Sequence, residues 1–570
     1  MTNNHKTIVG VLLAEAGLSV PPEETERLAR LYPGMRHSVN HFHTVETGDE
    51  VAAAVFRADE TWGSSPTDGE QIASGSHHNP SGSAGAPAGD RGRGSVGAGA
   101  PWTIESAGAA LRSGANTSVG LVESMQAAAD DLDATVGTWL ARFNDQALAR
   151  ARQADAELAG GTDLGPLHGI PLGIKDILAT DEGPTTAQSL VLDPHWGDQG
   201  DGPVLDRLRA AGAIVMGKTT TMEFAIGRPD FSKPFPIPRC PWDLDRWAGG
   251  SSSGTANGVA SGQILGGLGT DTGGSVRLPA AYNGISGHKP TFGLVPKSGC
   301  VPLGLSYDHI GPLARSAWDC AALLNVMAGA DASDRTTVER PSEDYLSSID
   351  RGLEGLRIGV IDNDELADGS STTTMAVLAD ALDDLRAGGA TTVGFEVPHY
   401  RQLSTAAFLA LQAEAFAWHR NMLINRWADY GRPTRLTIAQ GALINGADLV
   451  QIERVRQVAR SQLLRLMADK HIDLLVGPTT GHAAAPFSGA SSEVVSTKAL
   501  HTPPWNTTGF PALSVPMGFD DDHLPLGLQI IGPPFGDALV LAAGHAYQQA
   551  TAWHLEVAPH HGSLPATGAP

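Results

Sequence analysis

Short apolar runs alternate with longer amphipathic stretches over most of the chain. The runs are five to seven residues long, and they lie at residues 170–176, 213–217, 356–361, 472–478, 512–518 and 526–532. Strands that alternate with helical segments favour a parallel or mixed sheet covered by helices. The pattern therefore predicts an α/β fold built on a large mixed β-sheet.

Helical patterns separate and flank these runs. Residues 144–158 (NDQALARARQADAEL) start with an Asn–Asp pair that can cap a helix, and Ala and Leu then recur at helical spacing. Residues 379–470 are mostly helical in pattern and end in a long amphipathic stretch, VQIERVRQVARSQLLRLMADK. We expect this second region to form a helical addition to the sheet.

A small helical unit is predicted over residues 1–62. In VPPEETERLARLY, Pro22 and the acidic residues after it indicate a helix start, and Leu28, Leu31 and Tyr32 mark an apolar stripe. The composition then changes at residues 63–101, which are rich in Gly, Ser, Pro and Ala and contain almost no large apolar side chain. Such a segment cannot bury enough surface to offset its ordering entropy.

We therefore predict three parts: the helical unit at 1–62, a flexible linker at 63–101 and one large domain at 102–570.

Charge and cysteine content narrow the functional class. Lys and Arg total 39 and Asp and Glu total 62, which gives a net charge of −23. This sign is wrong for neutralising phosphates over an extended surface, so we expect no nucleic-acid partner. The three cysteines are outside any CxxC spacing and no run is long enough to span a membrane, which together favour a cytoplasmic protein that does not bind membranes. Neither a metal nor a cofactor is predicted.

Two short motifs suggest chemistry that their surroundings do not support. Residues 212–219 (GAIVMGKT) satisfy the phosphate-loop pattern, but that loop must follow a strand, and here the middle of the motif is itself the strand. Residues 250–254 (GSSSG) satisfy the nucleophile-elbow pattern around Ser252, but no apolar strand precedes them. A Ser-His-Asp esterase that uses Ser252 with Asp308 and His309 stays open as a weak alternative.

A lysine is the other side chain that can act as base for a serine. The stretch 249–279 (GGSSSGTANGVASGQILGGLGTDTGGSVRLP) holds five serines and no histidine. A serine hydroxyl needs a neighbouring base, and a lysine held neutral by burial can serve. Upstream, Lys175 stands near the end of the apolar run in GPLHGIPLGIKD, where an inward-facing side chain would have a lowered pKa.

Together, GIPLGIKD, GGSSSGTANGVASG and GTDTGGSVRLPAAYNGISGHKPTFGLVP resemble the amidase signature family of serine amidohydrolases. The resemblance covers about residues 165–315, with weaker echoes at 506–518 and 524–532. It implies the fold of that family, a large, twisted mixed sheet with helices on both faces. It also implies a Ser-cisSer-Lys triad, with Ser275 as nucleophile, Ser251 as bridging serine after a cis peptide bond, and Lys175 as base.

The residues around Ser275 fit an oxyanion hole. Glycines allow the backbone to approach a substrate carbonyl closely and to turn its N–H groups toward one point. The predicted donors are the amides of Thr272, Gly273, Gly274 and Ser275. Supporting roles are predicted for Asp271 and Arg277, which flank the nucleophile and hold the loops in place, and for Ser252, which donates to the network or to substrate.

The resemblance implies hydrolysis of a carboxylic amide, or of a related anilide, hydrazide, carbamate or ester, through an acyl-enzyme on Ser275. A glutaminase subunit of a tRNA-dependent amidotransferase is the main alternative. We expect a small-molecule amide as substrate and leave a homodimer open. The apolar and aromatic side chains in residues 228–247 and 406–460 predict the pocket walls.

The N-terminal unit has a resemblance of its own. Its sequence, LLAEAGLSVPPEETERLARLY, is faintly similar to the small helical subunit that accompanies the amidase of the tRNA amidotransferase and of some catabolic amidases. We therefore expect it to be a fused helper that packs on the amidase domain, with a dimerisation arm as the alternative.

Overall fold

A computed structural model describes residues 2–48, 101–488 and 499–562. One sheet of 11 strands runs through the large domain, in the order β1-β3-β2-β6-β8-β7-β12-β13-β11-β9-β10, and β4 and β5 form a separate pair. The strands are β1 Trp139–Arg142, β2 Pro171–Lys175, β3 Ile214–Thr219, β4 Arg239–Cys240, β5 Asp243–Trp247, β6 Gly266–Asp271, β7 Ser286–Lys289, β8 His309–Ala314, β9 Arg357–Ile361, β10 Thr391–Phe395, β11 Leu474–Pro478, β12 Ala512–Phe519 and β13 Pro525–Ile531.

The sheet is mixed, as the sequence predicts. Strand β2 is parallel to both β3 and β6, and β9 is parallel to both β10 and β11, whereas the strands between these two groups pair antiparallel. All six predicted runs are strands: β2, β3, β9, β11, β12 and β13. The phosphate-loop pattern lies along β3, and Lys218 in it is buried and donates a hydrogen bond to Thr185 Oγ1 at 2.8 Å.

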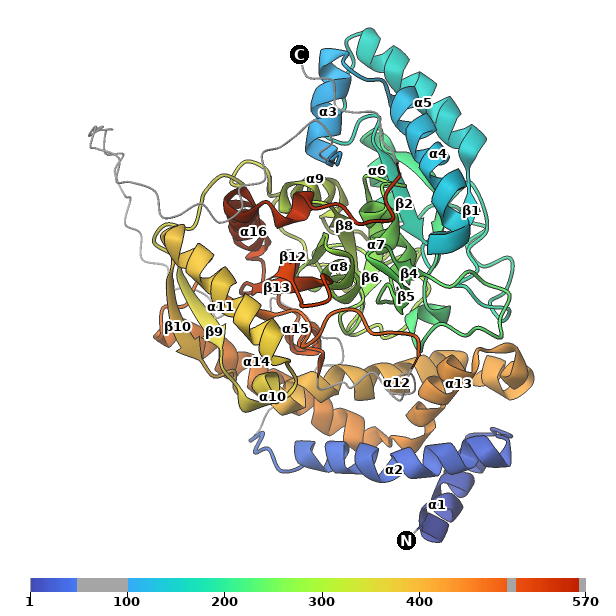
Figure 1. The fold of residues 1–570 in the computed structure, drawn as a ribbon. Helices are drawn as coiled ribbons and strands as arrows, with labels where there is room; N and C mark the ends of the chain where they lie inside the picture. Colours follow the sequence, from blue (N-terminus) through green and yellow to red (C-terminus); the bar gives the residue numbers. More distant parts are fainter. Residues whose placement is uncertain (1, 49–100, 489–498, 563–570) are drawn as a thin grey trace.

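Helices surround the sheet (Figure 1). They are α1 Thr2–Glu15, α2 Pro22–Phe42, α3 Ile104–Ser113, α4 Ser118–Val136, α5 Asn144–Ala159, α6 Pro203–Ala210, α7 Ser253–Ala260, α8 Arg277–Asn283, α9 Ala317–Met327, α10 Asp364–Asp368, α11 Thr372–Ala387, α12 Tyr400–Arg426, α13 Arg432–Ala439, α14 Gly446–Asp469, α15 Pro503–Thr508 and α16 Asp537–Thr551, with 3-10 turns η1 Glu223–Ala225, η2 Trp427–Asp429, η3 Gln440–Leu443 and η6 Trp553–Leu555.

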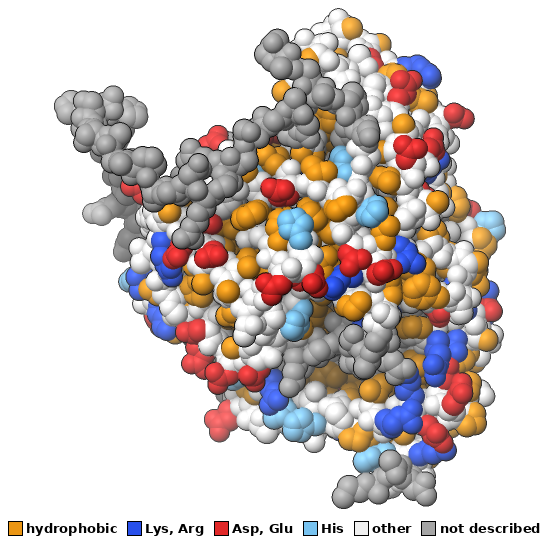
Figure 2. Space-filling view, in the orientation of Figure 1, with side chains coloured by type: hydrophobic (Ala, Val, Ile, Leu, Met, Phe, Trp, Pro, Cys, Tyr) orange, Lys and Arg blue, Asp and Glu red, His pale blue; other side chains and the backbone are white. Residues whose placement is uncertain are grey.

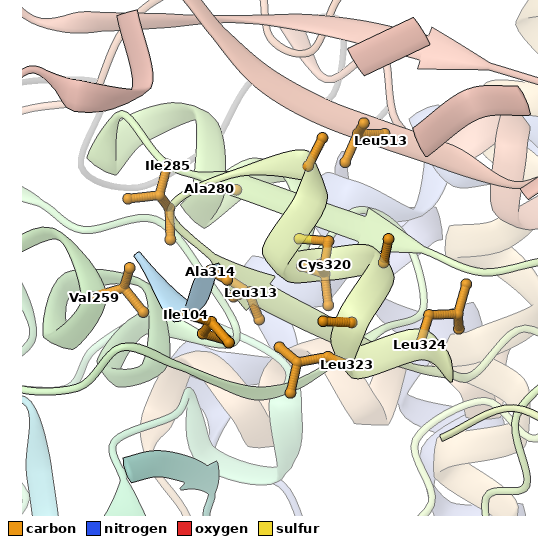
Figure 3. Close-up of a cluster of buried hydrophobic side chains, with 14 of the residues drawn as sticks. Ile104, Val259, Ala280, Ile285, Leu313, Ala314, Cys320, Leu323, Leu324 and Leu513 are labelled. Carbon is orange, nitrogen blue, oxygen red and sulfur yellow. The ribbon is translucent and has the colours of Figure 1, made fainter. Parts of the chain in front are cut away.

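The main core lies between the sheet and α9. Figure 3 shows Cys320, Leu323 and Leu324 on α9 pointing toward Leu313 of β8, and all four side chains are buried. Side chains of this size remove most of their apolar surface from water when buried, which stabilises the fold by about 25 cal/mol per Å². The sheet that carries the site is therefore held rigidly.

Helices α1 and α2 form the predicted N-terminal unit and pack on α12, α14 and η3 of the large domain (Figure 1). Helix α2 begins at Pro22, as the sequence predicts. The linker predicted at residues 63–101 lies outside the described residues apart from Pro101, so the three-part division stays a prediction. Within the ranges that the structure covers, no helix has both the length and the apolarity needed to cross a membrane.

Candidate active site

Three segments far apart in the sequence meet at one edge of the sheet. Lys175 is the last residue of β2, and the loop that carries Ser275 follows the neighbouring strand β6. Because β2 and β6 are parallel, with Ile174 opposite Leu268, their carboxyl ends lie side by side. Ser251 and Ser252 immediately precede α7, which packs on both strands. The fold thus brings together the segments that the sequence singles out.

Lys175 lies in a buried pocket of hydroxyl groups. Its Nζ is 2.7 Å from Ser251 Oγ, 2.8 Å from Thr270 Oγ1 and 3.1 Å from Ser252 Oγ. Its side chain is fully buried. Burial lowers the pKa of Lys175 to about 7, although the nearby Cys300, Asp271 and Asp308 act in the opposite direction. A large fraction of this amine is therefore neutral at neutral pH.

Ser251 follows a cis peptide bond. The bond between Gly250 and Ser251 is cis, as the resemblance implies. Ser251 is fully buried and its carbonyl accepts a hydrogen bond from the Met222 amide at 3.2 Å. Ser252 is buried too, and its hydroxyl donates to the Thr270 carbonyl at 3.2 Å. The supporting position predicted for Ser252 agrees with these contacts.

Ser275 is next to this pair of serines and faces open space. Its carbonyl accepts a hydrogen bond from the Ser252 amide at 3.1 Å. Unlike Lys175 and Ser251, Ser275 is partly exposed, and it lines the large pocket described below. Of the three predicted triad residues, Ser275 is thus the one that a substrate can reach.

Asp271 and Arg277 hold the Ser275 loop from behind. The Arg277 guanidinium donates two hydrogen bonds of 2.9 Å to the Asp271 carboxylate, and both side chains are completely buried. Arg277 also donates to Asn506 Oδ1 and Gln529 Oε1, each at 2.7 Å. Despite its burial, the Asp271 carboxyl has a pKa well below its usual range, because Arg277 is adjacent. The structure therefore agrees with the supporting roles predicted for both residues.

One predicted oxyanion donor is occupied. The sequence predicts the Gly274 amide as a donor, but this N–H donates to Asp271 Oδ1 at 2.8 Å. Gly274 has a φ of +128°, and a Cβ there would lie 2.1 Å from Thr502 Oγ1, so this position shapes the turn. The amides of Thr272, Gly273 and Ser275 stay as predicted donors.

The Ser-His-Asp alternative does not assemble. His309 Nδ1 lies 2.7 Å from the Tyr307 carbonyl and its Nε2 lies 3.3 Å from Lys289 Nζ. Asp308 accepts from the Leu303 and Gly304 amides, so it does not orient the ring of His309. Burial also holds the pKa of His309 well below its usual value. Ser252 contacts Lys175, and this alternative is wrong on geometry.

A pocket of about 450 Å³ opens above Ser275. Its lining consists mainly of apolar groups, and it includes Met222, Ile226, Trp247, Phe408, Leu411 and Leu436. The two regions predicted as pocket walls both contribute, through Arg228 and Trp247 and through the residues of α12 and α13. Its volume is that of a typical binding site for a small organic group.

Several site residues escape prediction from the sequence. Thr270, the third hydroxyl around Lys175, lies in the quoted motif, but only the parallel pairing of β2 and β6 shows its role. Asn506 donates to the Asp271 carboxylate at 2.7 Å across 235 positions. It stands first in the weak echo at residues 506–518, which is the signal that the sequence offers for it.

The mixed sheet with this site defines an α/β enzyme of the amide-cleaving class. A family model described as Amidase matches residues 120–541, well over half of the chain. The chain therefore belongs to the amidase signature family, and it is an enzyme that acts on C–N amide bonds.

Curated relatives are named as one and the same component of Glutamyl-tRNA(Gln) amidotransferase. The relative from Chloroflexus aurantiacus is 38% identical to this chain over 479 residues, which is 80% of this chain and 97% of the relative. The relative from Roseiflexus sp. strain RS-1 is 37% identical over 476 residues, which is 79% of this chain and 97% of the relative.

Solved structures share the fold over most of the chain. An s-triazine catabolic enzyme, described with a vestigial protein complex, has a TM-score of 0.74 at 28% identity and covers 79% of this chain and 99% of its own. Peptide amidase from Stenotrophomonas maltophilia has a TM-score of 0.67 at 29% identity, with coverages of 82% and 99%. The corresponding amidotransferase component of Thermotoga maritima has a TM-score of 0.63 at 28% identity, with coverages of 79% and 95%.

These relatives correct the expected partners. The sequence predicts a small-molecule amide, no nucleic acid and at most a homodimer, whereas the relatives are named as subunits of an amidotransferase of a tRNA. The net charge of −23 bears only on direct contact between this chain and phosphates. It does not report on other subunits that would make that contact, and this is why the prediction from charge is wrong. On the face in Figure 2, acidic side chains lie in many places among basic ones.

Proposed function

We propose that this chain cleaves amides through an acyl-enzyme on Ser275, with Ser251 and neutral Lys175 as its proton relay. The observation that carries this proposal is the 2.7 Å contact between Lys175 Nζ and Ser251 Oγ in a fully buried pocket. Ser275 Oγ attacks the amide carbonyl, its proton passes to Ser251, and Ser251 gives its own proton to Lys175. The amides of Thr272, Gly273 and Ser275 stabilise the oxyanion.

The same groups then act in reverse. The protonated relay returns a proton to the amide nitrogen, which leaves as ammonia or an amine and frees the acyl group on Ser275 Oγ. Water attacks this ester, and its proton enters the relay as the acid is released. Lys175 suits both directions, because a pKa of about 7 matches neutral pH.

Glutamine is the amide donor that the relatives favour. Their name and their 37–38% identity over about four fifths of this chain support a glutaminase subunit of a tRNA-dependent amidotransferase. Ammonia formed at Ser275 would then be used by partner subunits. The fused α1–α2 unit on the large domain agrees with a chain that evolved beside such subunits.

A second candidate rests on the pocket. A volume of about 450 Å³ with a mainly apolar lining exceeds what the side chain of glutamine fills. It supports an amidohydrolase that cleaves an amide, anilide, hydrazide, carbamate or ester with a bulky apolar acyl group and needs no other subunit.

Ammonia release by the purified chain separates the two candidates. We expect wild type to release ammonia or amine, Ser275→Ala and Lys175→Ala to lose at least about a thousandfold in kcat/KM, and Ser298→Ala, outside the site, to behave as wild type. Glutamine cleavage that depends on added amidotransferase subunits supports the first candidate, and anilide cleavage by the chain alone supports the second. Full activity of Ser275→Ala would contradict the mechanism.

A further inference from the structure

The N-terminal unit is anchored on the wall of the substrate pocket. The buried Glu24 on α2 accepts hydrogen bonds from Arg435 Nη2 at 2.7 Å and from Trp427 Nε1 at 2.9 Å. Leu28 of α2 is also buried, in one apolar cluster with Leu411 and Leu436. Because Leu411 and Leu436 line the pocket, α2 and the pocket wall share a core.

Helix α2 also reaches the pocket itself. Arg27 and Leu31 both line the pocket that contains Ser275, and they lie four residues apart on one face of α2. Leu31 is 40% exposed, which is unusual for a large apolar side chain of this unit. A position at the pocket mouth gives this exposed apolar surface a binding role.

The pocket is basic although the protein is acidic. Among the described residues that line it, the charged ones are Arg27 and Arg228, and none is Asp or Glu. The chain as a whole carries a net charge of −23. Guanidinium groups bind carboxylates through strong, charge-assisted hydrogen bonds, especially where apolar walls exclude water.

From this arrangement we infer that α2 selects the substrate: Arg27, together with Arg228, binds a carboxylate on the acyl part, and Leu31 packs on its carbon chain. The substrate class is thus an amide whose acyl chain carries a second, anionic carboxyl group. This inference deepens the proposed function and rests on it for the position of the amide at Ser275.

Arg27 gives the sharper test of the two arginines. Arg228 also borders a small cavity that contains Glu223 and Asp230, so a change there disturbs more than the pocket. Arg30 supplies a matched control, because it is an exposed arginine on the same helix and is not among the described pocket-lining residues.

Kinetics with two amides of equal shape test charge selection. Glutaramate, the monoamide of glutaric acid, carries a carboxylate where 5-methylhexanamide carries two methyl groups. For Arg27→Gln we expect KM for glutaramate to rise about tenfold or more with little change in kcat, since one charge-assisted hydrogen bond is lost. Kinetics with 5-methylhexanamide should be unchanged, Arg27→Lys should recover part of the loss, and Arg30→Gln should match wild type. Equal losses for both amides would overturn the inference.

Binding to an inactive enzyme separates this inference from the proposed function. In the Ser275→Ala background, calorimetry should show that glutaramate binds about tenfold more tightly than 5-methylhexanamide and that adding Arg27→Gln removes this preference. Charge-selective binding without turnover by wild type would support the inference and contradict the proposed function. No preference for glutaramate in Ser275→Ala, with an unfolding temperature like that of wild type, would overturn the inference whatever the activity.

Discussion

The environment of Lys175 determines the chemistry at the residue scale. A lysine at a strand end is normally solvated and charged, but this one is completely buried among Ser251, Ser252 and Thr270. The neighbouring hydroxyls can donate to a neutral amine or accept from an ammonium group, so both protonation states are stabilised by hydrogen bonds. This is the property that a reversible proton relay requires.

The pH dependence of catalysis follows from the Lys175 pKa. Because the relay starts from neutral Lys175 and its pKa is lowered to about 7, the competent fraction falls as pH decreases through 7. We predict that kcat/KM is nearly constant above about pH 8 and falls about tenfold per unit below about pH 6. A rate profile between pH 5 and 9 measures this, and a flat profile down to pH 5 would show that Lys175 is not the base.

The buried Asp271–Arg277 pair contributes to stability as well as to the site. Arg277→Met leaves the Asp271 charge buried without its main partner, so we predict a loss of about 3–5 kcal/mol in the free energy of unfolding. Urea unfolding measures the loss. Arg386→Met, which breaks the exposed pair with Asp383, is the control and should have little effect. Equal stability of Arg277→Met and wild type would contradict this account.

At the scale of elements, β6 shows where prediction from the sequence ends. The six apolar runs are recognisable because buried strands are rich in Val, Ile and Leu. Strand β6 (GGLGTD) lies in the same sheet but consists largely of glycine, which disfavours strands. Its glycines are needed for close packing: a Cβ at Gly267 would lie 2.2 Å from the Gly173 carbonyl, and one at Gly269 would lie 2.5 Å from Ser252 Oγ.

Gly267→Ala should therefore disrupt the sheet at the site. The added methyl group meets backbone of β2, which cannot move aside easily, so we predict a loss of about 3 kcal/mol or more in stability together with a loss of activity. Thermal unfolding and kcat/KM measure the two effects. Gly446→Ala is the control, because a Cβ there meets nothing within 4 Å. A stable and fully active Gly267→Ala would refute the role of close packing at β6.

The candidate site is predictable only as far as its residues lie in continuous motifs. Lys175, Ser251 and Ser275 stand in such motifs, and the structure brings their segments together. Asn506 acts through tertiary contacts with Asp271, and such contacts between distant segments leave no local pattern. Arg27 lies in the predicted helical unit, but its position at the pocket depends on how α2 packs on α12 and α14.

At the scale of the whole molecule, α1 and α2 are part of the enzyme's core structure. Glu24→Ala removes the acceptor of Arg435 and Trp427 at this interface, so we predict a loss of about 1–3 kcal/mol in stability. Thermal unfolding checks the value. Glu26→Ala lies on the same helix and breaks only an exposed pair with Lys6, so it should leave the unfolding temperature unchanged. Identical behaviour of the two variants would mean that α2 is not anchored through Glu24.

The central claim is that segments spread over about a hundred residues assemble one nucleophile, Ser275. Labelling with a fluorophosphonate tests it most directly, because the attacking oxygen forms a stable bond to phosphorus and fluoride leaves. Peptide mapping by mass spectrometry should find the label on Ser275 in wild type, strongly slowed labelling in Lys175→Ala, and none at the site in Ser275→Ala. Label on Ser252, or unchanged labelling of Ser275→Ala, would contradict the account.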